Sequence, residues 1–136
     1  MNYYLDTDIC IFALKDEFPT IKKELHGFTP EDIKIPSLVQ AELLLGALKS
    51  ANPRQEITIV ERFLSPYEII PFGKQEAVVY AKIRCDLEKK GTSIGPNDLI
   101  VAATVLAHQG VLVTHNTKEF DRIAGLLTQD WTKQAS

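Results

Sequence analysis

The sequence has few cysteines and histidines, and none of its hydrophobic runs approaches the roughly 20 residues that span a bilayer. Cys10 and Cys85 are far apart and match no metal-binding or redox spacing, so we expect two reduced thiols. His26, His108 and His115 include no i, i+4 pair and therefore suggest no zinc site. A metal site in this chain would have to be built mainly from oxygen ligands.

An excess of positive charge is also absent, because the formal net charge is −3. This argues against a strongly basic nucleic-acid coat. It does not exclude an enzyme that holds a phosphodiester through bound cations, since the metal ions then supply the positive charge. The opening MNYYLDTD has no basic segment of the kind that begins a secretory signal, and we expect a cytoplasmic protein. No P-loop, GxSxG or glycine-rich dinucleotide turn is present.

The length and the order of predicted elements indicate one α/β domain over residues 1–136. Predicted strands alternate with predicted helices, which favours a mostly parallel sheet covered by helices on both faces. The predicted strands are residues 3–5, 33–35, 67–72 and 111–113. The predicted helices are residues 9–15, 21–25, 37–48, 55–64, 74–90 and 97–108, with a short helix at 119–123 and a frayed tail after Trp131.

Asp6 is the first of three acids in otherwise apolar surroundings. It follows the apolar strand 3–5 directly, and ligands of open α/β sheets bind beyond the carboxyl ends of the strands. The alternative is a turn-forming aspartate, which is common after strands.

Glu42 is the second acid, and the pattern of its helix predicts that it joins an apolar face. That face, by the i, i+3, i+4, i+7 rule, comprises Leu38, Ala41, Leu45 and Leu48. A carboxylate buried there must be paired, protonated or bound to a metal, because burying a lone charge is prohibitive. The alternative is a structural salt bridge.

Asp98 is the third acid and begins a helix that is nearly all apolar from residue 99 to residue 105. The helix dipole favours an acid in the first turn, so a purely structural role is the alternative. A weaker polar cluster, Asn116, Glu119 and Asp121, follows the fourth strand and has a solvated helix face as its alternative.

These acids can converge on one pocket, where carboxylates repel one another unless cations neutralise them. Oxygen-rich sites of this kind suit Mg²⁺ or Mn²⁺ better than Zn²⁺. Such a site can polarise a phosphoryl oxygen and activate water, which is the chemistry of phosphodiester hydrolysis.

The acidic positions also resemble those of a known family. The resemblance is carried by three segments: YLDTDICIFALK, PSLVQAELLLGALKS and GPNDLIVAATVLAHQGVLVTHNTKEFDRIAGLLTQDW. In this order they are similar to the PIN-domain ribonucleases and, within these, to the VapC toxins of bacterial toxin–antitoxin pairs. The resemblance covers nearly the whole chain and implies a three-layer sandwich, a mostly parallel sheet flanked by helices.

The resemblance also implies roles for the acids. Asp6 and Asp98 would be the principal Mg²⁺ ligands, with Mn²⁺ as a substitute, and Glu42 would bind the metal or orient the attacking water. Family members often carry a further acid after the fourth strand, where this sequence has Asn116 with Glu119 nearby. These two residues are the expected contributors to a fourth position, and Glu119 is counted among the catalytic residues.

The partners implied by the resemblance are an RNA substrate, a cognate antitoxin and a second copy of the chain. Structured RNA, notably transfer RNA cut in the anticodon loop, is the suggested substrate. Asp8 stands where the family usually has Asn or Ser, and it either adds charge to the site or points away. Five basic residues either contact phosphates or form solvated helix faces: Arg54, Lys82, Arg84, Lys89 and Lys90.

Two other functions remain open at this point. Asp6-Thr7-Asp8 after an apolar strand imitates the nucleophile and acid of haloacid-dehalogenase-type phosphohydrolases, although that function leaves Glu42 without a role. The second is a non-catalytic module that binds RNA or protein, which the amide of Asn116 keeps open.

Overall fold

The computed structural model describes residues 1–133 and contains a five-stranded sheet in which all pairs of neighbouring strands are parallel. Its strands, in the spatial order β3-β2-β1-β4-β5, have the bounds β1 Tyr3–Leu5, β2 Ile33–Pro36, β3 Glu68–Ile70, β4 Val111–Val113 and β5 Leu127–Gln129. From β1 the chain continues outward to β2 and β3, then returns to β4 on the other side of β1. The crevice beyond the carboxyl ends of β1 and β4 is therefore the topological switch point at which open α/β sheets bind ligands.

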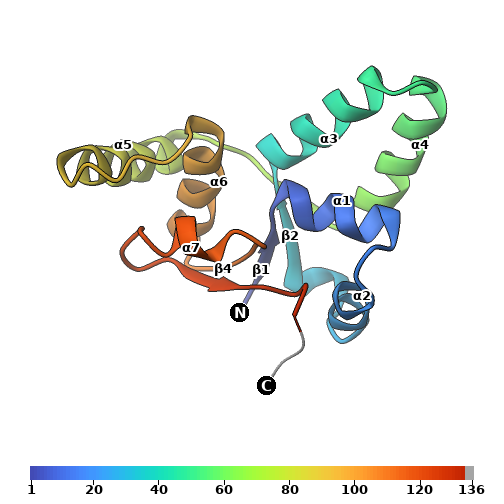
Figure 1. Cartoon of the computed structure of the whole chain (residues 1–136), viewed down its shortest axis with the longest axis horizontal. Coiled ribbons are helices and arrows are strands. Elements are labelled where there is room, and N and C mark those ends of the chain that lie inside the picture. Colours follow the sequence, from blue (N-terminus) through green and yellow to red (C-terminus); the bar gives the residue numbers. More distant parts are fainter. Residues whose placement is uncertain (134–136) are drawn as a thin grey trace.

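Helices connect all consecutive strands, as parallel pairing requires. Their bounds are α1 Thr7–Lys15, α2 Pro19–His26, α3 Ser37–Lys49, α4 Pro53–Leu64, α5 Lys74–Lys89, α6 Pro96–Ala107 and α7 Thr117–Phe120, with a 3₁₀ turn at Pro30–Asp32. Figure 1 shows α5 and α6 to the left of the β1–β2 pair and α3 and α4 to its right. No helix within residues 1–133 is both long enough and apolar enough to cross a membrane.

The central strands are buried because their sequences are apolar on both faces, as expected for a sheet covered by helices. Leu5, Leu112 and Val113 are completely buried. Gly110 allows β4 to begin against β1, since a Cβ atom at this position would stand only 2.4 Å from Tyr4 Cε1. The close approach of β4 to β1 at this point therefore requires a residue without a side chain next to the Tyr4 ring.

Most predicted elements are confirmed, including four strands and the six longer helices. Gly91 ends α5 with a positive φ of 69°, as a glycine after a helix often does. The predicted start of α3 at Ser37 is correct, whereas α7 begins at Thr117 where the sequence predicted 119–123. The edge strand β5 was missed because its three residues, LTQ, are too few and too polar to give a strand pattern.

The predicted inner face of α3 is wrong. Val39, Leu43 and Ala47 are buried, whereas Leu45 and Leu48 are 51% and 59% exposed. The helix is apolar on almost every side, so its sequence did not distinguish the inner face from the outer one. Packing against α1, α4 and the sheet made that choice.

The prediction of a frayed tail after Trp131 is wrong for the next residue and otherwise falls largely outside the described residues, since 134–136 are not described. Trp131 is 3% exposed and its ring stacks on Phe28, with 5.6 Å between centroids. Thr132 donates from its backbone N–H and its hydroxyl to Asp130, at 2.9 and 2.6 Å. Residues 130–132, which follow β5, are thereby held in place.

Candidate active site

Asp6 is fixed at the switch point by both central strands and by α1. Its backbone N–H donates to the carbonyl oxygen of Val113 at 3.1 Å, directly after β1. Its carboxylate accepts the backbone N–H of Ile9 at 3.0 Å and so caps α1. The turn-forming role considered from the sequence is therefore real, but it places the carboxylate in the crevice between β1 and β4.

Burial in this crevice raises the pKa of Asp6 to about 6. The Thr114 hydroxyl and the Ile9 N–H stabilise the ionised carboxylate and work in the opposite direction. The negative charges of Asp8 and Asp98 raise the pKa further. The hydrogen bonds to Asp6 therefore offset only part of the rise in its pKa that burial and the neighbouring acids cause.

Glu42 approaches the site from α3 and is held by the residue that follows Asp6. The Thr7 hydroxyl donates to Glu42 Oε1 at 2.6 Å, a contact that joins α1 to α3. Glu42 is half-buried and takes part in none of the ion pairs formed within residues 1–133. Glu42 thus forms no structural salt bridge in this part of the chain, and no hydrogen bond within it reaches Oε2 of Glu42.

Asp98 lies in the first turn of α6, which is buried from Val101 to Val105 as the sequence predicted. Its own burial raises its pKa, and the charges of Glu119, Glu42 and Asp8 raise it further. Among the described residues no hydrogen bond reaches its carboxylate. Acids from α1, α3 and α7 therefore act electrostatically on Asp98 of α6.

The polar exit of β4 supplies the remaining side chains. Asn116 Nδ2 donates to Glu119 Oε2 at 2.6 Å, and the Thr114 hydroxyl accepts the backbone N–H of Asn116 at 3.0 Å. Asp121, in contrast, accepts the Thr128 hydroxyl at 2.9 Å and is exposed, so it belongs to the outer surface. Asp8 is exposed, yet its charge acts on both Asp6 and Asp98.

Comparison with known proteins gives the family of the chain. The family model that describes the PIN domain matches residues 3–126. The chain belongs to the PIN-domain family. Ribonuclease VapC2 of Rickettsia felis is 39% identical over 134 residues, which are 98% of this chain and 100% of that protein. The tRNA(fMet)-specific endonuclease VapC of Salmonella typhimurium is 35% identical, over 96% of this chain and 98% of that protein.

Solved structures place the chain in the same branch of the family. The crystal structure of DNA-bound VapBC from Salmonella typhimurium has a TM-score of 0.91 at 35% identity and covers 96% of this chain and 98% of that chain. VapBC2 from Rickettsia felis, bound to a DNA fragment from its promoter, has a TM-score of 0.89 at 38% identity, over 96% and 99%. These likenesses confirm the parallel three-layer fold and the VapC resemblance, and they leave the phosphohydrolase alternative without support.

The chemistry of the acids in this PIN domain fits a hard divalent cation, although no three His, Cys, Asp or Glu side chains within residues 1–133 stand close enough to hold one as placed. All donors are oxygen atoms, which Mg²⁺ and Mn²⁺ prefer. Within residues 1–133, Glu42 and Glu119 each accept a hydrogen bond at one carboxylate oxygen, and no hydrogen bond reaches the other. Burial is the main cause of the raised pKa values of Asp6 and Asp98, and the neighbouring negative charges that add to it would be neutralised by a cation.

Sequence analysis did not single out Thr7 and Thr114, the two hydroxyl residues of the site. Thr7 holds Glu42, and the completely buried Thr114 lowers the pKa of Asp6. Their signal was position, since each directly follows, or lies one residue beyond, the carboxyl end of a central strand. A threonine between two strand-end acids was, however, equally compatible with an ordinary turn.

A groove with a cavity volume of about 550 Å³ runs beside Glu42 between α1, α3 and α4. Most of its lining is apolar, and the charged residues in it are Lys15, Glu42 and Glu56. One catalytic candidate is therefore accessible from a largely apolar surface, of the kind that marks binding grooves.

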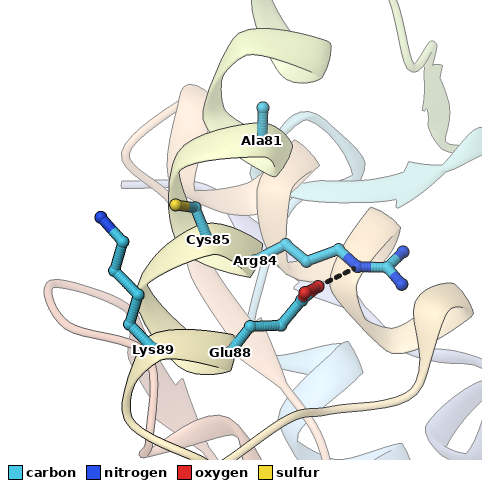
Figure 2. Close-up of a pocket in the computed structure, with 5 residues that line it drawn as sticks. All are labelled: Ala81, Arg84, Cys85, Glu88 and Lys89. Carbon is cyan, nitrogen blue, oxygen red and sulfur yellow. Dashed lines mark hydrogen bonds and ion pairs between the residues drawn. The ribbon is translucent and has the colours of Figure 1, made fainter.

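The basic residues of α5 surround a different hollow, which none of the site acids lines. Figure 2 shows this surface, formed by Ala81, Arg84, Cys85, Glu88 and Lys89. Arg84 pairs with Glu88 at 3.1 Å, and Lys90 pairs with Asp86 at 3.0 Å. Charges engaged within their own helix favour the solvated-face interpretation of α5 over phosphate contacts.

Proposed function

We propose that this PIN domain is a metal-dependent endoribonuclease that hydrolyses phosphodiester bonds in RNA and acts as the toxin of a toxin–antitoxin pair. The observation that carries the proposal is that the buried carboxylate of Asp6 at the switch point feels the negative charge of Asp98, which adds to the rise in its pKa. The curated relatives carry the names ribonuclease VapC and tRNA(fMet)-specific endonuclease. Transfer RNA in the cytoplasm is accordingly the substrate to test first.

Asp6 and Asp98 are proposed to hold Mg²⁺, with Glu42 and Glu119 completing the acidic set and Asn116 supporting Glu119. A bound Mg²⁺ ion supplies polarisation of a phosphoryl oxygen and a more acidic water. Thr7 orients Glu42, so that its free oxygen can bind the metal or accept a proton from the attacking water. Asn116 likewise orients Glu119, because its Nδ2 donates a 2.6 Å hydrogen bond to Glu119 Oε2.

The antitoxin is proposed to occupy the apolar groove beside Glu42. The solved relatives are complexes of VapC with VapB, which supports a cognate antitoxin as partner. A peptide in this groove would lie against Glu42 and restrict access to the acids. Silencing by occlusion requires no change in the fold.

The test of the function is incubation of antitoxin-free protein with total RNA, with and without Mg²⁺ or Mn²⁺. We expect discrete fragments only when a divalent metal is present, and sequencing of their ends would name the target. Cleavage that persists in a chelator, or RNA binding without cleavage under either metal, would contradict the proposed reaction. The second result would instead support the non-catalytic binding module.

A second copy of the chain is proposed to cover the outer face of α3. Ala41, Leu45 and Leu48 are exposed there at i, i+4 and i+7, a spacing that forms one apolar stripe. Leu48→Glu is expected to convert a dimer into a monomer in analytical ultracentrifugation, because a charge would be buried in the contact. Thr92→Glu, at an exposed loop residue, is the control and should leave the mass unchanged. A wild type that sediments as a monomer would refute the contact.

A further inference from the structure

His115 lies between two residues of the active site, but its side chain serves neither of them. Before it, Thr114 stabilises the ionised form of Asp6, and after it, Asn116 donates to Glu119. The sequence suggested no zinc site at this histidine. The structure gives its imidazole ring partners of its own.

The His115 ring is held in place by Asp130 and Thr132. His115 Nδ1 lies 3.2 Å from Asp130 Oδ2 and 3.0 Å from Thr132 Oγ1. Burial alone would raise the pKa of Asp130, but bonds from Thr132 and His115 hold it below its usual range. An ionised carboxylate can only accept a hydrogen bond, so Nδ1 of His115 is the donor in its contact with Asp130. The His115 side chain nevertheless remains 52% exposed, whereas that of Asp130 is 9% exposed.

Two phenylalanines bring their rings to the same place. The His115 ring centroid is 6.1 Å from that of Phe12 and 6.4 Å from that of Phe18, and the two phenylalanine centroids are 4.8 Å apart. Phe12 belongs to α1, the helix capped by Asp6, and Phe18 directly precedes α2. Both are half-buried. Three rings from three segments thus form one cluster, called here the ring cluster, with His115 as its exposed member.

We propose that the ring cluster binds an unpaired nucleobase of the RNA, next to the phosphodiester that the acids hydrolyse. Single-stranded RNA is recognised largely by stacking of its bases on Phe, Tyr, Trp or His rings. The net charge of −3 limits what general attraction to phosphates can contribute to binding. A pre-positioned ring on the residue between Thr114 and Asn116 supplies affinity that does not depend on charge. This inference rests on the proposed ribonuclease function and adds a substrate contact to it.

The experiment measures binding of a short single-stranded RNA that carries the fluorescent base 2-aminopurine at each position in turn around the cleavage site. It uses full-length protein with Asp6→Asn, so that the RNA stays intact. His115→Ala is expected to weaken binding by about fivefold to a hundredfold, the usual effect of losing one base stack. It should also abolish the fluorescence quenching at one position. His115→Phe keeps a ring without the Asp130 contact and should restore both signals.

Two further variants and a check of folding make the result decisive. His26→Ala removes an exposed histidine from α2 and should leave RNA affinity unchanged, and circular dichroism checks the fold of every variant. Phe18→Ala tests a second ring of the cluster and should also weaken binding. Unchanged affinity in His115→Ala, or equal weakening in His115→Ala and His115→Phe, would overturn stacking while wild-type cleavage still stands. Absence of RNA cleavage by the wild type would overturn the proposed function itself.

Discussion

Asp98→Asn is expected to reduce metal-dependent RNA cleavage by at least about a hundredfold. Replacing a residue that merely orients a metal ligand already costs roughly 10–100-fold in metal affinity or activity, so removing a ligand should cost no less. Asp98 is half-buried in the first turn of α6, and the charges of Glu119 and Glu42 act on it directly. The measurement is the initial rate of RNA cleavage over a series of Mg²⁺ concentrations.

The matched control is Asp121→Asn, the same acid-to-amide change on the outer surface. Asp121 accepts a hydrogen bond from Thr128 and contributes to the pKa of neither Asp6 nor Asp98. We expect it to cleave RNA at the wild-type rate. If Asp98→Asn kept the wild-type rate at every Mg²⁺ concentration, Asp98 would not be a ligand and the acidic mechanism would fail.

Asp6→Asn is expected to stabilise the metal-free protein by about 3 kcal/mol at pH 7.5 while abolishing its activity. The shift in the pKa of Asp6 from 3.8 to about 6 corresponds to about 1.4 kcal/mol for each pH unit. Asparagine caps helices about as well as aspartate, so the contact to Ile9 should survive the change. The variant therefore loses the cost of a buried charge and keeps the local structure. Urea unfolding in the presence of a chelator measures the difference.

The pH dependence follows from the direction of the shift. Above pH 6 the carboxylate of Asp6 is ionised in both states, and the folded state bears the full cost of its burial. Between about pH 6 and pH 4 the folded protein takes up the proton before the unfolded chain does, so the wild type regains stability relative to Asp6→Asn. Below about pH 4 the two proteins should be equally stable. Glu76 and Asp130 have lowered pKa values in the folded protein, so their protonation in acid reduces the free energy of unfolding of both proteins alike.

Mg²⁺ provides an independent check on the same variant. A ligand that binds only the folded state raises the free energy of unfolding. Wild-type protein should therefore gain stability on addition of Mg²⁺, whereas Asp6→Asn should gain little. A variant that is less stable than the wild type at pH 7.5 would show that the carboxylate of Asp6 is needed for folding rather than for a metal.

The sequence alone predicted most of the elements and the candidate acids, because both predictions depend on local patterns. The sequence predicts short apolar strands that are followed by polar residues, Asp6 and Asn116 among them. It also predicts helices that are bounded by proline or glycine. Their alternation predicted a parallel sheet, and parallel strands bring their carboxyl ends to one edge. The sequence therefore predicts that Asp6 and the residues after β4 lie at the same edge of the sheet.

Only the tertiary structure decided which side of a uniformly apolar helix faces inward and what each site residue touches. In α3 the sequence offered several apolar faces, and packing buried Val39 and Leu43 while leaving Leu48 exposed. The Thr7 bond to Glu42 and the His115 contact with Asp130 join residues 35 and 15 positions apart. Such contacts depend on how the helices and the chain end are set against the sheet. Local sequence patterns carry no information on that, because the energy that fixes it comes from burial and shape across the whole fold.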